Sequence, residues 1–327
     1  MPRQKHNHLV AHVRSFPAGV GAGAVVTVWA MPGRAAIVVE GGAMRGVFSV
    51  GVLDTFLEND FNPFDLAIGT SAGACNLASH VAGQNGRNRR SYFDLMTRRE
   101  FIDPRRFFAR GGSIVDLDWL WRTLAEKEPL DVAAILRSPT ELIVAATSGK
   151  TGEPVYFRPR EHDMFDVLKG SCALPVLYRN QVRVGSETLI DGGVSDPIPV
   201  EEAYRRGARR IVVVRSRPAA YVKTNGFSTR LSAWLLRSEP AVARAVERTA
   251  ERYQRAVAFL KNPPKDCRIV EVAPAVSLAT RRTTQERALL ERDYAVGREL
   301  GMETMERWAT LSAGPRSSWP PKASNSI

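Results

Sequence analysis

A strand, a sharp turn and a helix are predicted within residues 65–82, and this stretch constrains the fold more than any other. The apolar run Leu66–Ile68 is typical of a buried strand, and small and apolar residues at helical spacing follow through Val81. The turn between them reads Gly69-Thr70-Ser71-Ala72-Gly73. Its two glycines would let the backbone turn sharply and keep side chains away, so that the Ser71 hydroxyl stands exposed at a helix N-terminus. Ser71 is therefore the candidate nucleophile.

Taken alone, this motif is a weak signal, because a G-x-S-x-G pentapeptide arises by chance in roughly one chain in ten of this length. The alternative interpretation is a glycine-rich strand-to-helix turn with a capping serine. A nucleophilic serine would also need an oxyanion site and a proton acceptor from elsewhere in the chain.

A second glycine-rich turn follows the predicted strand Ala35–Val39, a continuous apolar run of the kind that is buried on both faces of a sheet. This turn reads Glu40-Gly41-Gly42-Ala43-Met44-Arg45-Gly46, and a helix is predicted to begin after it. Bare backbone N–H groups would then lie at a helix N-terminus, where they can hold an anion or a developing oxyanion. A dinucleotide site would need an acidic residue roughly twenty positions further on, and the Ser71 turn occupies that space.

A serine nucleophile usually relies on a histidine as base. Five histidines are present: His6, His8, His12, His80 and His162. The first three precede the predicted folded part, and His80 lies about 13 Å from Ser71 along the same helix. An α/β-hydrolase order would need a histidine after the acid, and none follows His162. His162 stays open as a base, but a Ser-His-Asp triad is not expected.

Asp191 is the other candidate base. It follows the apolar strand Thr188–Ile190 and precedes Gly192 and Gly193. Its carboxylate can therefore lie at the sheet edge that carries Ser71 and accept hydrogen bonds from turn N–H groups. The alternative is an ordinary Asp-Gly-Gly turn.

Three motifs, in this order and spacing, resemble the signature elements of the patatin-like phospholipases. They are Glu40–Gly46, Gly69–Gly73 and Asp191–Gly193, and Ser171-Cys172-Ala173-Leu174-Pro175 resembles a further segment of the family. The resemblance extends from about Arg34 to Val214. The remaining C-terminal third looks like the extension of an uncharacterised bacterial subgroup.

The resemblance implies a three-layer α/β/α fold with a mainly parallel central sheet and a C-terminal helical extension. It also implies a dyad of Ser71 and Asp191 without histidine, an oxyanion hole made by Gly41, Gly42 and Ala43, and no metal or cofactor. The supporting residues would be Arg45, Gly46, Gly69, Gly73, Gly192 and Gly193. The implied reaction is hydrolysis of lipid carboxyl esters, of the phospholipase A or lysophospholipase type. Arg45 could brace the glycine-rich loop, which we favour, or steer a phosphate.

One residue departs from the family pattern, because the third glycine of the oxyanion loop is Ala43 here. If that position needs a positive φ, alanine costs roughly 1 kcal/mol or more. Two alternatives therefore stay open: acyl transfer or thioester hydrolysis by the same serine, and a catalytically weak lipid-binding scaffold, for which Ala43 is the only hint.

Charge is distributed unevenly along this chain of net charge +12. Residues 87–110 carry eight arginines against three acidic residues, and residues 201–261 carry fourteen lysines and arginines against five acidic residues. These regions could meet an anionic membrane surface or anionic lipid head groups, or they could be solvated faces. Nucleic acid is not expected as a partner, because no binding motif accompanies the charge. The three cysteines are expected to be reduced and mostly buried.

Alternating strands and helices without a long linker predict a single α/β domain over residues 34–311, with a core over 34–214 and an extension over 215–311. Residues 1–33 are expected to be a loosely ordered extension, and 312–327 a disordered tail. Residues 1–33 resemble a signal peptide with a poor cleavage site, so a cytoplasmic location with peripheral membrane contact is favoured over secretion. An amphipathic basic helix is predicted over Pro240–Lys261 and a charged helix over Thr284–Trp308. Residues 156–165 are predicted as a loop into a helix.

Overall fold

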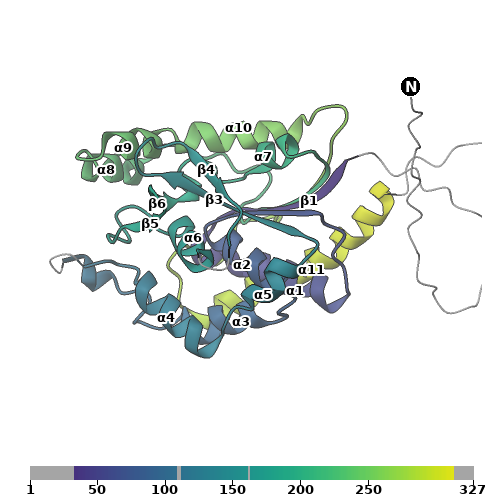
Figure 1. The fold of residues 1–327 in the computed structure, drawn as a ribbon, viewed down its shortest axis with the longest axis horizontal. Helices are drawn as coiled ribbons and strands as arrows, with labels where there is room; N and C mark the ends of the chain where they lie inside the picture. The colour runs from purple at the N-terminus through teal and green to yellow at the C-terminus, as the bar shows by residue number, and fades with distance from the viewer. Residues whose placement is uncertain (1–32, 109–111, 161–162, 313–327) are drawn as a thin grey trace, which may run out of the picture.

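A central sheet lies between two layers of helices in the computed structural model, which describes residues 33–108, 112–160 and 163–312 (Figure 1). The sheet has eight strands: β1 (Arg34–Val39), β2 (Leu66–Thr70), β3 (Glu141–Ser148), β4 (Pro154–Phe157), β5 (Val182–Val184), β6 (Glu187–Asp191), β7 (Ala208–Val214) and β8 (Arg268–Val272). Hydrogen-bonded neighbours run β5-β6-β3-β2-β1-β7-β8, and β4 also pairs with β3. The predicted three-layer α/β/α fold is confirmed.

Five neighbouring strands, β3, β2, β1, β7 and β8, are parallel. Their carboxyl ends therefore meet at one edge of the sheet, where open α/β folds place their ligands. The strands β4, β6 and β5 are added by antiparallel pairing. Buried residues fill both faces of β1 and β2, as their continuous apolar sequences predict.

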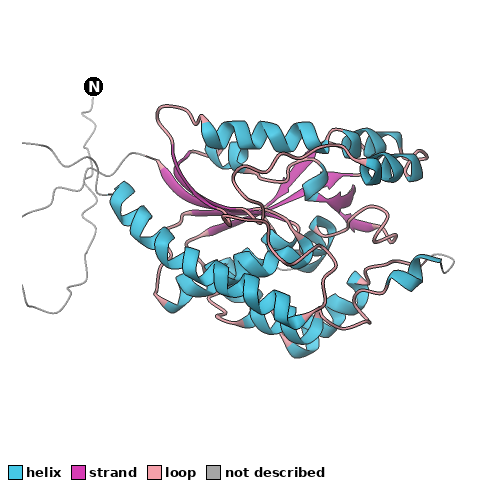
Figure 2. Ribbon diagram, turned by 180° about the vertical axis from the view of Figure 1, so that it is seen from behind, coloured by secondary structure: helices cyan, strands magenta, loops and turns pink. Residues whose placement is uncertain are grey.

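One face of the sheet is covered by α1 (Val47–Glu58), α2 (Ala72–Val81), α5 (Val132–Arg137), α6 (Met164–Ser171) and α11 (Arg287–Ser312). The long helix α11 crosses this face beside α1 (Figure 2). The two helices approach closely at Gly51 and Gly297, where a methyl group would collide with the opposite backbone. The charged helix predicted from Thr284 is confirmed, but it begins later and continues to Ser312.

The opposite face is covered by α7 (Val200–Arg205) and α10 (Thr249–Lys261), with α9 (Pro240–Glu247) and α8 (Phe227–Leu235) beside them (Figure 1). The prediction of one continuous helix over residues 240–261 was wrong, because the helix is interrupted at Arg248 (φ −85°, ψ 0°), between α9 and α10. This break lets α9 pack with α8 against Val194, while α10 packs against the sheet.

The segment after β3 differs from its prediction as a loop, because Pro154–Phe157 forms β4 and pairs with Val144–Thr147. The strand is short and half-buried, and it begins with a proline, so its sequence carries little strand signal. The predicted helix after it is confirmed as α6.

A third apolar cluster, separate from the two that cover the sheet, includes Val47 and Val50 of α1. Its buried residues come mainly from α1, a π-helical turn η2 (Ser91–Leu95) and α4 (Leu117–Lys127). The short helix α3 (Arg87–Arg90) precedes η2, and the 310 turn η3 (Pro104–Phe108) lies between η2 and α4 in the chain. Across the described residues, no helix combines the length and apolar character needed to cross a membrane. The terminal segments 1–32 and 313–327 lie outside the described residues, and the division into a core and an extension at residue 214 stays a prediction.

Candidate active site

Ser71 lies at a strained turn between β2 and α2. Its backbone has φ 54° and ψ −128°, a conformation that costs free energy for a residue with a Cβ. Neither flanking glycine has a positive φ, so their contribution is the second part of the prediction, the exclusion of side chains from the turn. A methyl group at Gly69 would collide with Ala74, and one at Gly73 would collide with the carbonyl oxygen of Val39. The glycines thus allow close packing, while the serine itself takes the unusual dihedral angles.

Asp191 reaches Ser71 through the pairing of both strands with β3. Thr70 of β2 pairs with Ala145, and Asp191 of β6 pairs with Ala146, the next residue along. β2 pairs with one edge of β3 and ends opposite Ala145, whereas β4 pairs with the other edge at Ala145 and Ala146. β6 therefore pairs with Ala146 on the same edge as β2, just beyond the end of β2. The Ser71 hydroxyl donates a hydrogen bond of 2.6 Å to Oδ2 of Asp191, and both residues are buried. The two sequence-predicted residues are therefore brought together at the carboxyl edge of the sheet.

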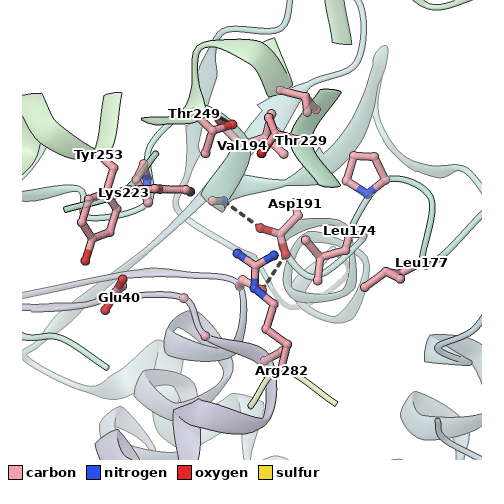
Figure 3. Close-up of a pocket in the computed structure, with 18 of the residues that line it drawn as sticks. Glu40, Leu174, Leu177, Asp191, Val194, Lys223, Thr229, Thr249, Tyr253 and Arg282 are labelled. Atoms are coloured by element: carbon pink, nitrogen blue, oxygen red, sulfur yellow. Dashed lines mark hydrogen bonds between the residues drawn. The ribbon is translucent and has the colours of Figure 1, made fainter. Parts of the chain in front are cut away.

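The Asp191 carboxylate is held by its own turn. The N–H of Gly193 donates a 2.7 Å hydrogen bond to Oδ1, as expected for an Asp-Gly-Gly turn (Figure 3). A methyl group at Gly192 would collide with the carbonyl oxygen of Ala145. Burial raises the pKa of Asp191, and the hydrogen bonds from Ser71 and Gly193 partly oppose this shift. The carboxylate is thus a stronger base than a solvated aspartate.

His80 lies away from this site, as the helical spacing predicts. It is buried, its pKa is lowered by burial to about 4, and it lines neither cavity described below. The histidines His6, His8, His12 and His162 lie outside the described residues.

The glycine-rich loop lies against Ser71, since a Cβ at Gly41 would be 3.0 Å from the Ser71 Cβ. Among the described residues, the N–H groups of Gly41, Gly42 and Ala43 donate to no protein acceptor. Ala43 has φ 50°, so the departure from glycine falls on a position that does take a positive φ. The loop adopts this conformation in spite of the alanine.

The charged side chains of Glu40 and Arg45 hold this loop in place through hydrogen bonds with Ser216. Glu40 accepts hydrogen bonds from the backbone N–H of Ser216 (2.6 Å) and from its hydroxyl (3.1 Å). Arg45 is buried, its Nε donates to the Ser216 Oγ at 3.3 Å, and burial lowers its pKa to about 10. These contacts favour the bracing role for Arg45. Gly46 leaves room for Tyr92, whose hydroxyl donates to the carbonyl of Ala43.

The three motifs lie within a stretch that matches a known protein family. Residues 37–204 match the sequence model of a family described as "Patatin-like phospholipase". This stretch is just over half of the chain and carries all three motifs. The chain belongs to the patatin-like phospholipase family.

The C-terminal part of this patatin-like chain matches a second family model over residues 239–312, described as a domain of unknown function (DUF6363). The chain is 39% identical over 275 residues to the "Uncharacterized protein YjjU" of Escherichia coli (strain K12), which covers 83% of this chain and 76% of that protein. The crystal structure of VipD from Legionella pneumophila is similar over 85% of this chain and 68% of its own, at 15% identity and a TM-score of 0.40.

Two cavities flank Ser71. The larger, of ≈ 320 Å³, contains Asp191 and has a mixed lining, in which the charged side chains of Glu40, Lys223 and Arg282 lie beside apolar ones such as Leu174 and Val194 (Figure 3). We call it the polar cavity because of these charged groups. The smaller, of ≈ 90 Å³, is mainly apolar and extends between α2 and α4; its lining includes Met96, Phe101, Leu117, Leu120 and Leu168. Ser71 and Ala43 line both cavities, so the hydroxyl lies where a polar and an apolar chamber meet.

Several residues of the site were missed from the sequence. Ser171 belongs to the quoted Ser-Cys-Ala-Leu-Pro segment, but no role was assigned to it; its hydroxyl accepts the N–H of Ser71 at 2.8 Å. Ser216, Lys223 and Arg282 carry no local motif, because they come from loops after β7 and β8. The free thiols of Cys75 and Cys172 are half-buried beside the apolar cavity, with their sulfurs 3.5 Å apart, whereas Cys267 is buried. In the part of the chain that the structure describes, no three His, Cys, Asp or Glu residues gather into a group that could hold a metal ion.

Proposed function

We propose that this protein is a serine acyl hydrolase of lipid carboxyl esters, of the phospholipase A or lysophospholipase type, with Ser71 and Asp191 as a catalytic dyad. Membership of the patatin-like family supports lipid hydrolysis in general. The observation that carries the proposal is the 2.6 Å hydrogen bond from the Ser71 hydroxyl to a buried carboxylate, beside three N–H groups that donate to no acceptor in the described part of the chain.

The proposed reaction begins as the Ser71 Oγ attacks the ester carbonyl carbon while Asp191 accepts the hydroxyl proton. The carbonyl oxygen becomes an oxyanion, which the N–H groups of Gly41, Gly42 and Ala43 stabilise. The C–O bond to the alcohol then breaks, and Asp191 gives its proton to the leaving oxygen. A water molecule attacks the acyl-enzyme, Asp191 accepts its proton, and Ser71 regains a proton as the fatty acid leaves.

The two cavities support a lipid ester as substrate. An ester carbonyl at Ser71 can direct its acyl chain toward the apolar cavity and its alcohol part toward the polar one. Ala43 adopts the positive φ that its position requires, so the alanine does not support the alternative of a catalytically weak lipid-binding scaffold.

The test is turnover of p-nitrophenyl butyrate by Ser71→Ala and Asp191→Asn variants. Each variant should lose at least 10³-fold in kcat/KM while keeping the wild-type circular dichroism spectrum. A fluorophosphonate probe should label Ser71 in the wild type only. A folded Asp191→Asn variant with wild-type turnover would refute the dyad. Product analysis with added alcohol or thiol acceptors separates hydrolysis from acyl transfer.

Peripheral membrane contact is proposed through α8. Four apolar side chains on this helix are exposed: Phe227 (81%), Trp234 (58%), Leu231 (43%) and Leu235 (38%). Thr229 and Ser232 of the same helix line the polar cavity, so this surface borders the entrance to the site. The arginines at the start of and within α10 are less available than predicted, since Arg248, Arg252 and Arg255 form ion pairs with Glu251, Glu153 and Glu201, respectively.

This contact is tested by sedimentation with vesicles that contain phosphatidylglycerol. Phe227→Ser combined with Trp234→Ser should weaken binding at least tenfold, and Met302→Ser, an exposed apolar residue on α11, should leave it unchanged. Binding should also weaken with added salt, because Arg230 and Arg237 belong to the same surface. If all variants bind the vesicles as the wild type does, α8 does not make the membrane contact. The cytoplasmic location stays a prediction.

A further inference from the structure

Besides Arg45, whose side chain bonds to Ser216, three cations of the polar cavity lack carboxylate partners among the described residues. Arg217, Lys223 and Arg282 all line the cavity, and within the described residues none of them forms an ion pair. Two of them lie near aromatic rings: the Arg217 guanidinium is 4.6 Å from the ring centre of Tyr221, and the Lys223 ammonium is 5.5 Å from that of Tyr253. Lys223 and Arg282 reach toward Asp191 from different sides in Figure 3.

The carboxylates of the cavity, Glu40 and Asp191, are outnumbered by its four cations, Arg45, Arg217, Lys223 and Arg282. Glu40 accepts two hydrogen bonds from Ser216, and Asp191 accepts one each from Ser71 and Gly193. The cavity therefore has an excess of positive charge.

The cations are close enough to repel one another. Burial lowers the pKa of Lys223 to about 8, and the next largest cause is the charge of Arg282. For Arg45, burial is again the largest cause of the lowered pKa; the charge of Glu40 opposes it, and the charges of Arg217 and Arg282 add to it. Like charges gathered in a partly buried cavity are destabilising on their own, and a bound anion would relieve that repulsion.

None of the three cations lies within residues 37–204, the stretch that matches the patatin-like family model. Arg217 and Lys223 follow β7, and Arg282 lies in the segment that matches the domain of unknown function. The backbone carbonyl of Arg282 also accepts a hydrogen bond from the N–H of Met44, next to the oxyanion loop. The C-terminal part of the chain thus supplies one wall of the active-site cavity.

We infer that Arg217, Lys223 and Arg282 bind the phosphate of an anionic acyl-ester lipid and make the enzyme prefer such lipids over zwitterionic ones. This inference rests on the proposed function, because it takes the ester carbonyl to lie at Ser71. Guanidinium and ammonium groups are the usual protein partners of phosphate oxygens. A phosphate with no attached cation, as in phosphatidate, fits the cavity better than phosphocholine, whose quaternary ammonium would face three positive side chains.

The test compares dihexanoyl phosphatidate with dihexanoyl phosphatidylcholine, both below the concentration at which they aggregate, so that no lipid surface contributes. The wild type should show the larger kcat/KM on phosphatidate. Arg282→Gln and Lys223→Gln should each lower the ratio of the two kcat/KM values about tenfold or more. Arg282→Lys, which keeps the charge, should lower it less. The matched control is Arg281→Gln, since Arg281 is exposed, adjacent and outside the cavity, and its ratio should equal that of the wild type.

A binding experiment separates this inference from the proposed hydrolysis. Ser71→Ala protein should bind dihexanoyl phosphatidate more tightly than dihexanoyl phosphatidylcholine by calorimetry, and adding Arg282→Gln should remove the difference. If both lipids are cleaved with equal kcat/KM by wild type and variants, the inference is wrong and the hydrolase stands. If neither lipid is cleaved but the binding difference is seen, the hydrolase proposal fails and the anion site stands. Binding of inorganic phosphate or glycerol 3-phosphate as tight as that of phosphatidate would overturn the assignment to a lipid.

Discussion

The backbone N–H of Ser71 donates a 2.8 Å hydrogen bond to the hydroxyl of Ser171, which lies one hundred residues further along the chain. The Ser171 hydroxyl in turn donates to the carbonyl of Ala145 in β3 at 2.6 Å. Ser171 therefore ties the strained turn to the strand that also positions Asp191. The Ser71 N–H is engaged in this way and is not free to hold an oxyanion.

Ser171→Ala should consequently weaken both stability and turnover. The variant leaves the buried N–H of Ser71 without an acceptor, so the free energy of unfolding should fall by about 1–3 kcal/mol. Turnover of p-nitrophenyl butyrate should fall about tenfold or more, because the strained serine loses one of its restraints. Urea denaturation and steady-state kinetics measure the two effects, with the exposed Ser238→Ala as control. Unchanged kinetics in Ser171→Ala would show that the turn is held by other contacts.

The activity of the enzyme should depend on the ionisation of Asp191. Burial raises its pKa above the usual 3.8, and only the ionised form can accept the Ser71 proton. The acidic limb of the profile of kcat/KM against pH should therefore have its midpoint above pH 3.8. A midpoint at or below that value would mean that another group controls the limb.

The raised pKa of Asp191 also predicts how the free energy of unfolding changes with pH. The folded state binds the Asp191 proton more tightly than the unfolded state, so the contribution of this group to the free energy of unfolding decreases as pH rises from 3.8 through the raised pKa. The free energy of unfolding of Asp191→Asn, relative to the wild type, should thus be higher at about pH 7 than at about pH 4. Urea titrations at both values measure this difference, and a difference independent of pH would contradict the shift.

Ala43→Gly should be nearly neutral in stability. Glycine relieves the strain of a residue at φ 50°, worth about 1 kcal/mol, and this gain offsets the larger entropy that glycine gives the unfolded chain. The control is Ala243→Gly within α9, where no strain is relieved and the free energy of unfolding should fall by about 0.5–1 kcal/mol. The kcat/KM of Ala43→Gly should equal or exceed that of the wild type. Equal destabilisation by the two substitutions would argue against strain at Ala43.

Val115→Phe should shift the preference for acyl chain length. Val115 lines the apolar cavity and is half-buried, so a larger side chain there would narrow the cavity. The ratio of kcat/KM for p-nitrophenyl palmitate to that for the butyrate ester should fall at least tenfold. Val276→Phe is the control, since Val276 is exposed and lies outside both cavities. An unchanged ratio in Val115→Phe would place the acyl chain elsewhere.

The amino-acid sequence by itself determined the local elements and the motifs that they carry. Continuous apolar runs predicted the buried strands, and the turns at Ser71 and Asp191 were recognisable because each depends on neighbouring glycines. Local signals failed where packing decided the outcome, at the short strand β4 and at the break in the helix at Arg248.

The tertiary structure alone decided what these elements do together. The meeting of Ser71 and Asp191 depends on the register of β2 and β6 along β3, which no stretch of a few residues encodes. Ser171, Lys223 and Arg282 likewise reach the site from distant segments without a motif of their own. Short-range preferences act over a few residues, whereas an active site is assembled by strand register and by the packing of loops at one edge of the sheet.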